Sequence, residues 1–139
     1  MKRTFVFLTA LLLLCASVSW VSAAPGDTIQ PLWVYVNYVN GTIDISSGGM
    51  ATVSASTRMK PGKVQKTTIT ASLQQYEAGR WKEIKSWTAS SSGTSAKLSE
   101  KNWMVAHGYS YRVLITAKAY AGTTLLEQGS YTANYGYFK

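Results

Sequence analysis

The stretch at residues 103–120, which reads WMVAHGYSYRVLITAKAY, decides the fold class of this chain. From position 109 onward its aromatic and aliphatic residues recur at every second position. Side chains of a β-strand return to one face at this period, so the stretch predicts a strand with one buried face. The residues that share this face are Tyr109, Tyr111, Val113, Ile115 and Ala117.

Similar alternation, rich in Ser, Thr, Val, Ile and Tyr, continues on both sides of this stretch and indicates further strands. These strands are predicted at 32–39, 42–46, 51–58, 66–76, 81–87, 94–98 and 124–135. The turn signals between them are Asn40-Gly41, Pro61-Gly62, 77–80 and 121–123. We expect one helical turn at 99–102. Short strands at this spacing predict an all-β fold, and we expect a single Greek-key β-sandwich of about seven strands.

The segment at 108–113, GYSYRV, resembles the sixth strand of fibronectin type III and immunoglobulin-like domains. In those domains a glycine turn precedes a tyrosine whose hydroxyl binds the chain just upstream. The resemblance implies an immunoglobulin-like β-sandwich in which Tyr111 is the structural corner tyrosine. The paired cysteines of antibody domains are missing here.

The whole length after residue 23 also resembles small secreted proteins of Gram-positive bacteria whose function is unknown. This resemblance is carried by LQQY at 73–76, GRWK at 79–82, SW at 86–87 and GYSYR at 108–112, behind a signal peptide. It implies a secreted bacterial protein with an immunoglobulin- or fibronectin type III-like β-sandwich. It carries no activity with it.

The first 23 residues have the three parts of a cleavable signal peptide. Lys2 and Arg3 form a basic start, an apolar run covers 5–15, and mostly small residues follow up to Ala23. The apolar run is shorter than the roughly 20 residues that a membrane-spanning helix needs. We expect cleavage after Ala23, because a cut one residue later would place Pro25 just past the scissile bond.

Cleavage at this point gives a signal peptide at 1–23, a short linker at 24–31 and one β-sandwich domain at 32–139. The alternative is a lipoprotein anchored at Cys15, but that signal needs a small residue before the cysteine, and Leu14 stands there. Because Cys15 is the only cysteine, the mature protein is expected to have no disulfide. We expect a secreted protein, extracellular or associated with the cell wall, with no transmembrane segment after signal removal.

The charge of the chain favours attraction to anionic partners. Its net charge is +8, and loss of Lys2 and Arg3 with the signal peptide lowers this to +6. Four basic residues without an acidic residue among them surround the turn at 61–62 and form the candidate polyanion-binding site. These residues are Arg58, Lys60, Lys63 and Lys66. They suit wall teichoic acids or anionic lipid surfaces, and the alternative is a solvated basic loop.

Residues that could carry catalysis or bind a metal are few. His107 is the only histidine, and without cysteine the mature chain lacks the ligand set of a zinc site. Nothing in the sequence pairs His107 with a nucleophilic serine and an orienting group. Glu77 and Glu83 share one hairpin with Lys82, so ion pairing is expected there in place of paired-carboxylate hydrolysis. We expect no catalytic residue, no cofactor, no metal and no nucleic-acid partner.

The aromatic residues offer a second candidate surface. Rows of rings on a sandwich can stack on sugar rings, but a sandwich without disulfides also needs such rings in its core. Trp81, Ile84 and Trp87 cannot share one face at a period of two, so we expect a β-bulge or one exposed tryptophan.

The expected function is that of a secreted, non-catalytic protein that binds an anionic cell-wall polymer or another extracellular protein. The alternative is a bacteriocin-like or membrane-active effector that uses its positive charge against anionic envelopes. A hydrolase ranks third.

Overall fold

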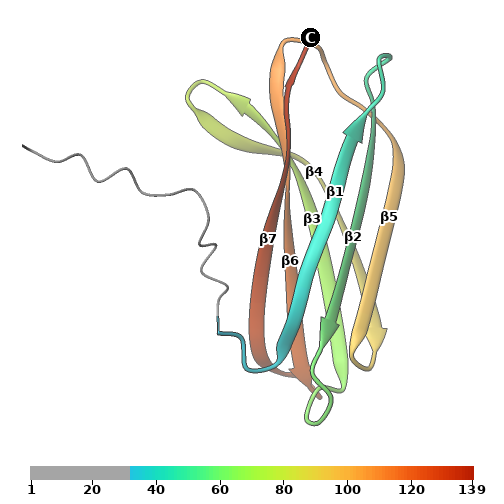
Figure 1. The fold of residues 1–139 in the computed structure, drawn as a ribbon, viewed down its shortest axis with the longest axis vertical. Coiled ribbons are helices and arrows are strands. Elements are labelled where there is room, and N and C mark those ends of the chain that lie inside the picture. The colour runs from blue at the N-terminus through green and yellow to red at the C-terminus, as the bar shows by residue number, and fades with distance from the viewer. Residues whose placement is uncertain (1–31) are drawn as a thin grey trace, which may run out of the picture. The chain divides into compact units, whose positions relative to one another are not determined.

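A computed structural model describes residues 32–139, and the predicted signal peptide at 1–23 and linker at 24–31 lie outside these residues. The described chain forms seven strands (Figure 1). They are β1 (Val36–Ile45), β2 (Met50–Met59), β3 (Lys66–Glu77), β4 (Arg80–Ser92), β5 (Ser95–Met104), β6 (Tyr109–Ala121) and β7 (Thr124–Phe138). Within this part of the chain there is no helix with the length and hydropathy that a membrane crossing requires.

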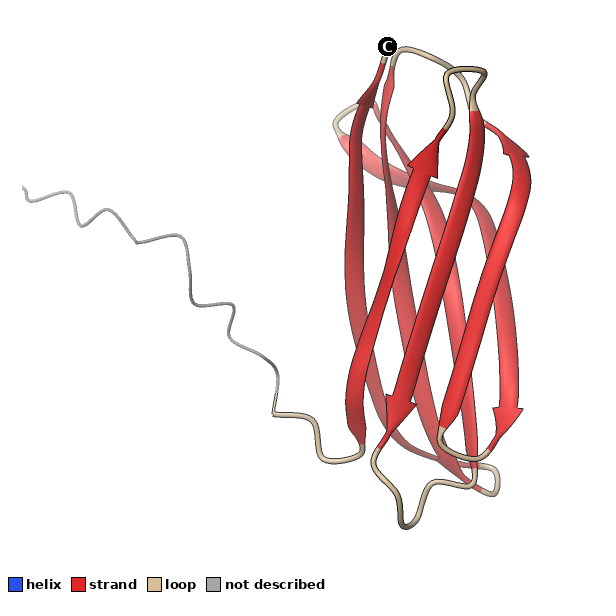
Figure 2. Ribbon diagram, turned by 45° about the vertical axis from the view of Figure 1, so that its right-hand side comes forward, coloured by secondary structure: helices blue, strands red, loops and turns tan. Residues whose placement is uncertain are grey.

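The strands form two antiparallel sheets, seen as two layers in Figure 2. One sheet has three strands in the order β1-β2-β5, and the other has four in the order β4-β3-β6-β7. Each of the five strand pairings is antiparallel. The predicted all-β class, with seven strands in two sheets, is confirmed.

The core lies between the two sheets and is built from alternate residues of their strands. In β6 the predicted buried face is confirmed, with Tyr109 only half-buried at its start. The side chains of this strand with no exposed surface are Tyr111, Val113, Ile115, Ala117 and Ala119. Complete burial of one aliphatic side chain contributes about 1.5–3 kcal/mol, so alternation along the inner strands supplies much of the stability of the fold.

The predicted turn at Asn40-Gly41 is wrong, because β1 runs through both residues without interruption. A Cβ atom at Gly41 would collide with the Ser54 carbonyl oxygen of β2 and with the Ile115 side chain of β6. Glycine therefore stands here because its neighbours approach too closely for any side chain. The role of Gly41 is in packing. The Asn-Gly dipeptide alone cannot distinguish a glycine in a turn from a glycine required by close packing.

The predicted helical turn at 99–102 is also wrong, because β5 continues through it to Met104. The pairing of β5 with β2 shifts register between Ala51 and Val53, and Asn102 adopts a positive φ of 73°. The segment lies on an edge strand, where its polar side chains face solvent. The bulge interrupts the period-two pattern in this part of β5, so the sequence pattern could not identify these residues as a strand.

The predicted irregularity in 81–87 is confirmed as a β-bulge. The pairing of β3 with β4 shifts register between Leu73 and Gln74, which leaves Ile84 without an opposite residue. Trp87 consequently lies opposite the buried Ala71, whereas Trp81 lies opposite Tyr76 on the outer face. Beyond the bulge the β3–β4 hairpin projects away from the rest of the sheet (Figure 1).

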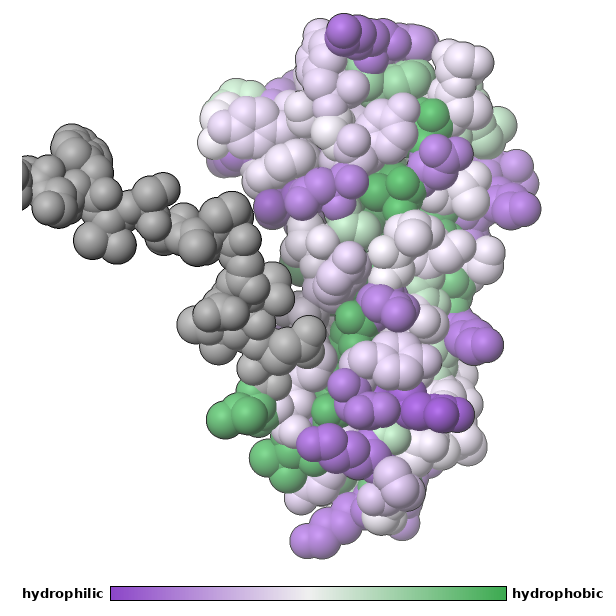
Figure 3. Space-filling model, viewed as in Figure 1, coloured by the Kyte–Doolittle hydropathy of each residue, from purple (hydrophilic) through white to green (hydrophobic). Residues whose placement is uncertain are grey.

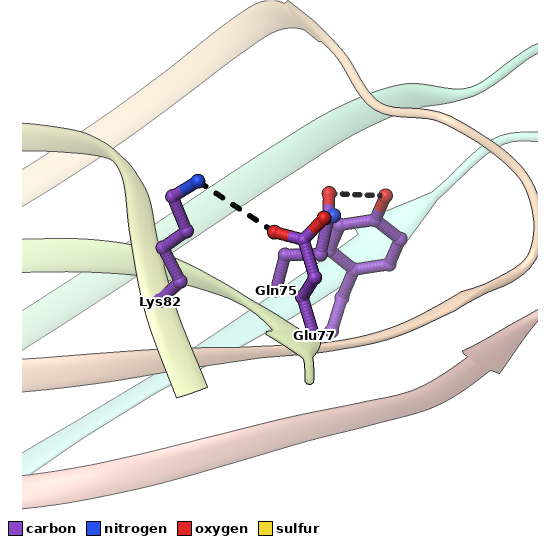
Figure 4. Close-up of polar contacts among 4 residues, drawn as sticks. Gln75, Glu77 and Lys82 are labelled. Atoms are coloured by element: carbon purple, nitrogen blue, oxygen red, sulfur yellow. Dashed lines mark hydrogen bonds and ion pairs between the residues drawn. The ribbon is translucent and has the colours of Figure 1, made fainter. Parts of the chain in front are cut away.

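Tyr111 links the start of β6 to the chain that precedes it. Its hydroxyl donates to the carbonyl oxygen of Ala106, five residues upstream, at 2.8 Å. The same hydroxyl lies 3.1 Å from Oε1 of Gln75 on β3, beside the Lys82–Glu77 ion pair (Figure 4). Burial raises the pKa of the Tyr111 hydroxyl and outweighs the Ala106 hydrogen bond, so the group is a neutral donor.

Candidate functional site

The four candidate basic residues lie at one end of the sheets, where β2 passes into β3. Arg58 alternates with the buried Thr57 and Met59, so it points outward from the three-stranded sheet. Lys66 precedes the buried Thr67 and points outward from the four-stranded sheet, with its ammonium 5.8 Å from the Tyr120 ring centroid. The structure therefore brings these residues to one end but points Arg58 and Lys66 outward from opposite sheets.

Lys60 contributes to the structure of this end. Its ammonium donates to the Trp33 carbonyl oxygen at 2.6 Å, and it lies near the Glu127 carboxylate. That carboxylate accepts the backbone N–H groups of 34, 35 and 36 at 2.8, 2.7 and 2.6 Å. Partial burial raises the pKa of Glu127, but the three N–H bonds and Lys60 outweigh it, so the pKa lies below its ordinary value.

The same segment is also held by packing. A Cβ atom at Gly129 of β7 would lie 3.0 Å from the Trp33 ring and 3.4 Å from the Val36 side chain. The absence of a side chain at Gly129 thus lets the indole approach β7 closely. Together with Glu127, this contact fixes residues 33–36 against the four-stranded sheet and orients the chain that enters β1.

A hollow of about 590 Å³ lies on the outer face of the three-stranded sheet. Two cross-strand rows of side chains line it, and its floor is the backbone between them. The rows are Asn40–Ser56–Lys97 and Thr42–Ser54–Ser99, and the floor is Gly41–Ala55–Leu98. The hollow exists because most of these outward side chains are short. Its lining offers hydroxyl and amide groups that can bind the hydroxyl or phosphate oxygens of a polymer.

A second cation, Arg58, lies next to the lining of the hollow. Arg58 follows Ser56 on the same face of β2, and Lys97 pairs with Ser56 from β5. Arg58 and Lys97 are therefore diagonal neighbours across two strands, within reach of long side chains. No acidic residue lines the hollow, so the two cations supply its charge.

Charge in the described residues is distributed unevenly along the strands. Basic residues at or near the β2–β3 end are Arg58, Lys60, Lys63, Lys66, Lys97 and Lys118, and the acidic residue there is Glu127. The other described acidic residues, Asp44, Glu77, Glu83 and Glu100, lie toward the opposite end, where they offset most of the charge of its six basic residues. Figure 3, which views the molecule as in Figure 1, shows hydrophilic side chains over both ends, so the two ends differ in net charge and not in polarity.

The groups that could carry other chemistry are engaged in the structure. His107 stacks on Phe138 at 4.1 Å between ring centroids, and its Nδ1 lies 2.5 Å from the Lys139 carbonyl oxygen. Glu77 pairs with Lys82 at 3.6 Å, and Glu83 accepts a hydrogen bond from Ser72. In residues 32–139 no three His, Cys, Asp or Glu side chains are grouped so that they could hold a metal ion.

Most tryptophans of the described chain serve packing. Trp33 rests on Gly129, while Trp87 and Trp103 lie against the core with the Lys85 ammonium near both rings. Trp81 differs, because it lies on the outer face beside Tyr76. The tryptophans of the described chain therefore do not share one row across a sheet.

Sequence reasoning identified Arg58 but missed the hollow and Lys97. The outward serines of β2 align with β1 and β5 through registers that no local pattern encodes. Comparison of this chain with protein-family models and with curated proteins finds no match.

Proposed function

We propose that this chain is a secreted, non-catalytic protein with an immunoglobulin-like Greek-key sandwich that binds anionic polymers of the cell envelope. The observation that carries the proposal is the hydroxyl-lined hollow beside Arg58 and Lys97, which has no acidic residue in its lining. Hydroxyl groups suit a polymer rich in hydroxyls, and the two cations suit regularly spaced phosphates or carboxylates.

The strand order supports the immunoglobulin-like part of the proposal. In such sandwiches the first, second and fifth strands share one sheet, and the third, sixth and seventh share the other. The same sets occur here, with β4 beside β3. Tyr111 near the start of the sixth strand donates to a carbonyl a few residues upstream, as a corner tyrosine does.

Export is proposed from residues 1–23 alone, whose basic, apolar and small-residue parts follow the order of a signal peptide. The expected mature chain begins at Ala24. Sequencing the N-terminus of protein recovered from the medium tests this, and an intact Met1 or a lipid on Cys15 would contradict it.

Polymer binding can be tested by sedimenting the protein with isolated walls of a Gram-positive bacterium. We expect binding at low salt and release as the salt concentration rises, because ions screen charges beyond about 8 Å at physiological ionic strength. Walls stripped of their phosphate polymers should bind less. Growth inhibition or leakage of anionic vesicles, without wall binding, would instead favour the membrane-active alternative.

Changing Arg58 and Lys97 to Gln isolates the contribution of the hollow. A basic residue near an anionic surface contributes about 1 kcal/mol, so removing two should weaken binding about thirtyfold. The matched control changes Lys101 and Lys139 to Gln, which removes the same charge from the opposite end. If both variants lost the same amount of wall binding, the interaction would depend on net charge alone, and the proposed site would be refuted. Lys60 is unsuitable for this test, because its ammonium binds the Trp33 carbonyl.

A further inference from the structure

The outer face of the four-stranded sheet carries a second set of polar and aromatic residues, at the end remote from the hollow. One cross-strand row contains Trp81, Tyr76, Ser110 and Tyr137, in the order β4-β3-β6-β7. The next row places Arg112 of β6 beside Gln74 of β3. We name the six residues of these two groups the arginine–aromatic patch.

Arg112 is held in one orientation within this patch. Its Nε donates to Oε1 of Gln74 at 2.7 Å, and its guanidinium carbon lies 4.2 Å from the centroid of the Trp81 ring. The hydrogen bond holds one edge of the guanidinium, and the contact with the Trp81 ring restricts its movement on one side. A guanidinium positioned in this way keeps its terminal N–H groups in a preorganised fork.

No carboxylate of the described chain satisfies this fork. In residues 32–139 the one ion pair within 4.0 Å joins Lys82 to Glu77. Glu83 is the acidic residue nearest to Arg112 in the strand register, but its carboxylate accepts from Ser72. Arg112 is thus an oriented cation on a half-buried surface, and planar carboxylates match its geometry in a bidentate manner.

The aromatic rings beside Arg112 offer apolar surface to the same ligand. Tyr76 is 44% exposed and Tyr137 is 59% exposed. They stand on β3 and β7, two strand spacings or about 10 Å apart. The short side chain of Ser110 lies between them in the row. The C–H faces of a pyranose ring pack on such tyrosines, while its hydroxyls can reach the Ser110 hydroxyl.

We infer that the arginine–aromatic patch binds an acidic sugar residue of a polysaccharide. The ring of the sugar would lie against Tyr76 or Tyr137, and its carboxylate would accept from Arg112. A neutral sugar would leave the oriented guanidinium unpaired, so the patch should discriminate in favour of the acidic one. This inference stands apart from the proposed function, because the patch lies on the opposite sheet and at the opposite end from the hollow.

Isothermal titration calorimetry with trigalacturonate, and with the neutral galactose trisaccharide as its counterpart, tests the inference. We expect the acidic trisaccharide to bind at least about tenfold more tightly, as one charge-assisted bidentate contact allows. Arg112→Gln should remove this preference, and Arg112→Lys should restore little of it because an ammonium has no fork. Arg80→Gln is the matched control, since it removes the same charge from the neighbouring β3–β4 hairpin, outside the six residues of the patch.

A second variant keeps the test informative if Arg112→Gln destabilises the sheet. Tyr137→Ala changes an exposed ring, so the fold should persist by circular dichroism while affinity for both trisaccharides falls. Equal affinity of the wild-type protein for the two trisaccharides, or no binding of either, would overturn the inference. The inference would also be overturned if trigalacturonate binding were lost in the Arg58 and Lys97 double variant but kept in Arg112→Gln. Polyphosphate is a further control. If it bound the wild-type protein as tightly as trigalacturonate does, and bound Arg112→Lys equally well, binding would be a simple charge effect and the inference would be overturned.

Discussion

Glu127→Gln should detach the segment that leads into β1. The carboxylate accepts three backbone N–H bonds from residues 34–36, and each bond to a charged group contributes about 1.5–3 kcal/mol. A glutamine oxygen can take the place of Oε2 and keep the bonds from Tyr35 and Val36, while its NH₂ group faces the Val34 N–H. One charged bond is then lost and two are weakened by about half, because their acceptor becomes neutral, which together equals about two charged bonds. Because the site is partly exposed, the lower figure applies, and we expect the free energy of unfolding to fall by about 3 kcal/mol.

Thermal unfolding followed by circular dichroism measures this loss. In a domain of this size each 1 kcal/mol lowers Tm by about 4–8 °C, so the decrease should be about 10 °C or more. Release of Trp33 from Gly129 should also shift the tryptophan emission toward that of solvated indole. Glu100→Gln is the matched control, because this carboxylate accepts no hydrogen bond from the described chain, and it should change Tm little. Equal Tm values for Glu127→Gln and wild type would refute the anchoring role.

The contribution of Glu127 should depend on pH with a defined sign. The folded-state pKa lies below its ordinary value of 4.5, so the stabilisation is complete above pH 4.5 and disappears as pH falls through the lowered folded-state value. The difference in Tm between wild type and Glu127→Gln should therefore be constant near neutral pH and shrink in acid. A difference that grew on acidification would contradict the assignment of the shift to the three N–H bonds.

Two substitutions in the sheets complete the set. Gly41→Ala should lower the free energy of unfolding in urea by about 3 kcal/mol, because the new methyl group meets the Ser54 carbonyl and Ile115. Gly48→Ala is its control, with no atom within 4 Å of the added carbon, and equal effects would refute the close-approach argument. Tyr111→Phe should cost about 1–2 kcal/mol, since it leaves the Ala106 carbonyl without its donor. Tyr137→Phe, at an exposed ring, should be near neutral, and an unchanged urea midpoint in Tyr111→Phe would refute the structural role of the hydroxyl.

Strands with one buried face were predictable from the sequence, because period-two alternation is a local property. β3 and β6 follow it closely, whereas β7 departs from it because its pairing with β6 shifts register twice. The mismatch among Trp81, Ile84 and Trp87 predicted a bulge or an exposed tryptophan, and the structure has the bulge. The same local view failed at Gly41, where a strong turn dipeptide lies inside a strand. The reason for glycine there is the close approach of Ser54 and Ile115, which are distant in sequence.

The candidate sites were less predictable than the strands, because they depend on contacts between residues that are distant in the sequence. Arg58 and Lys66 are close in sequence and were expected to act together, but the chain crosses between sheets there and sends them to opposite faces. Lys97 reaches the hollow from β5, nearly 40 residues after Arg58. Glu127 binds backbone groups more than 90 residues away. Such contacts depend on sheet register, which one sequence does not encode locally.

The bulge in β4 also bears on how the protein behaves when it is concentrated. β4 is an edge strand of 13 residues, and a flat edge of that length would present a continuous row of backbone donors and acceptors to another copy. The register shift breaks this row and turns the hairpin out of the plane. Directly beside it, Lys85 lies opposite the buried Leu73 with its ammonium 4.7 Å from the Trp103 ring centroid. An incoming strand would have to bury that charge, so β4 is poorly suited to edge-to-edge aggregation.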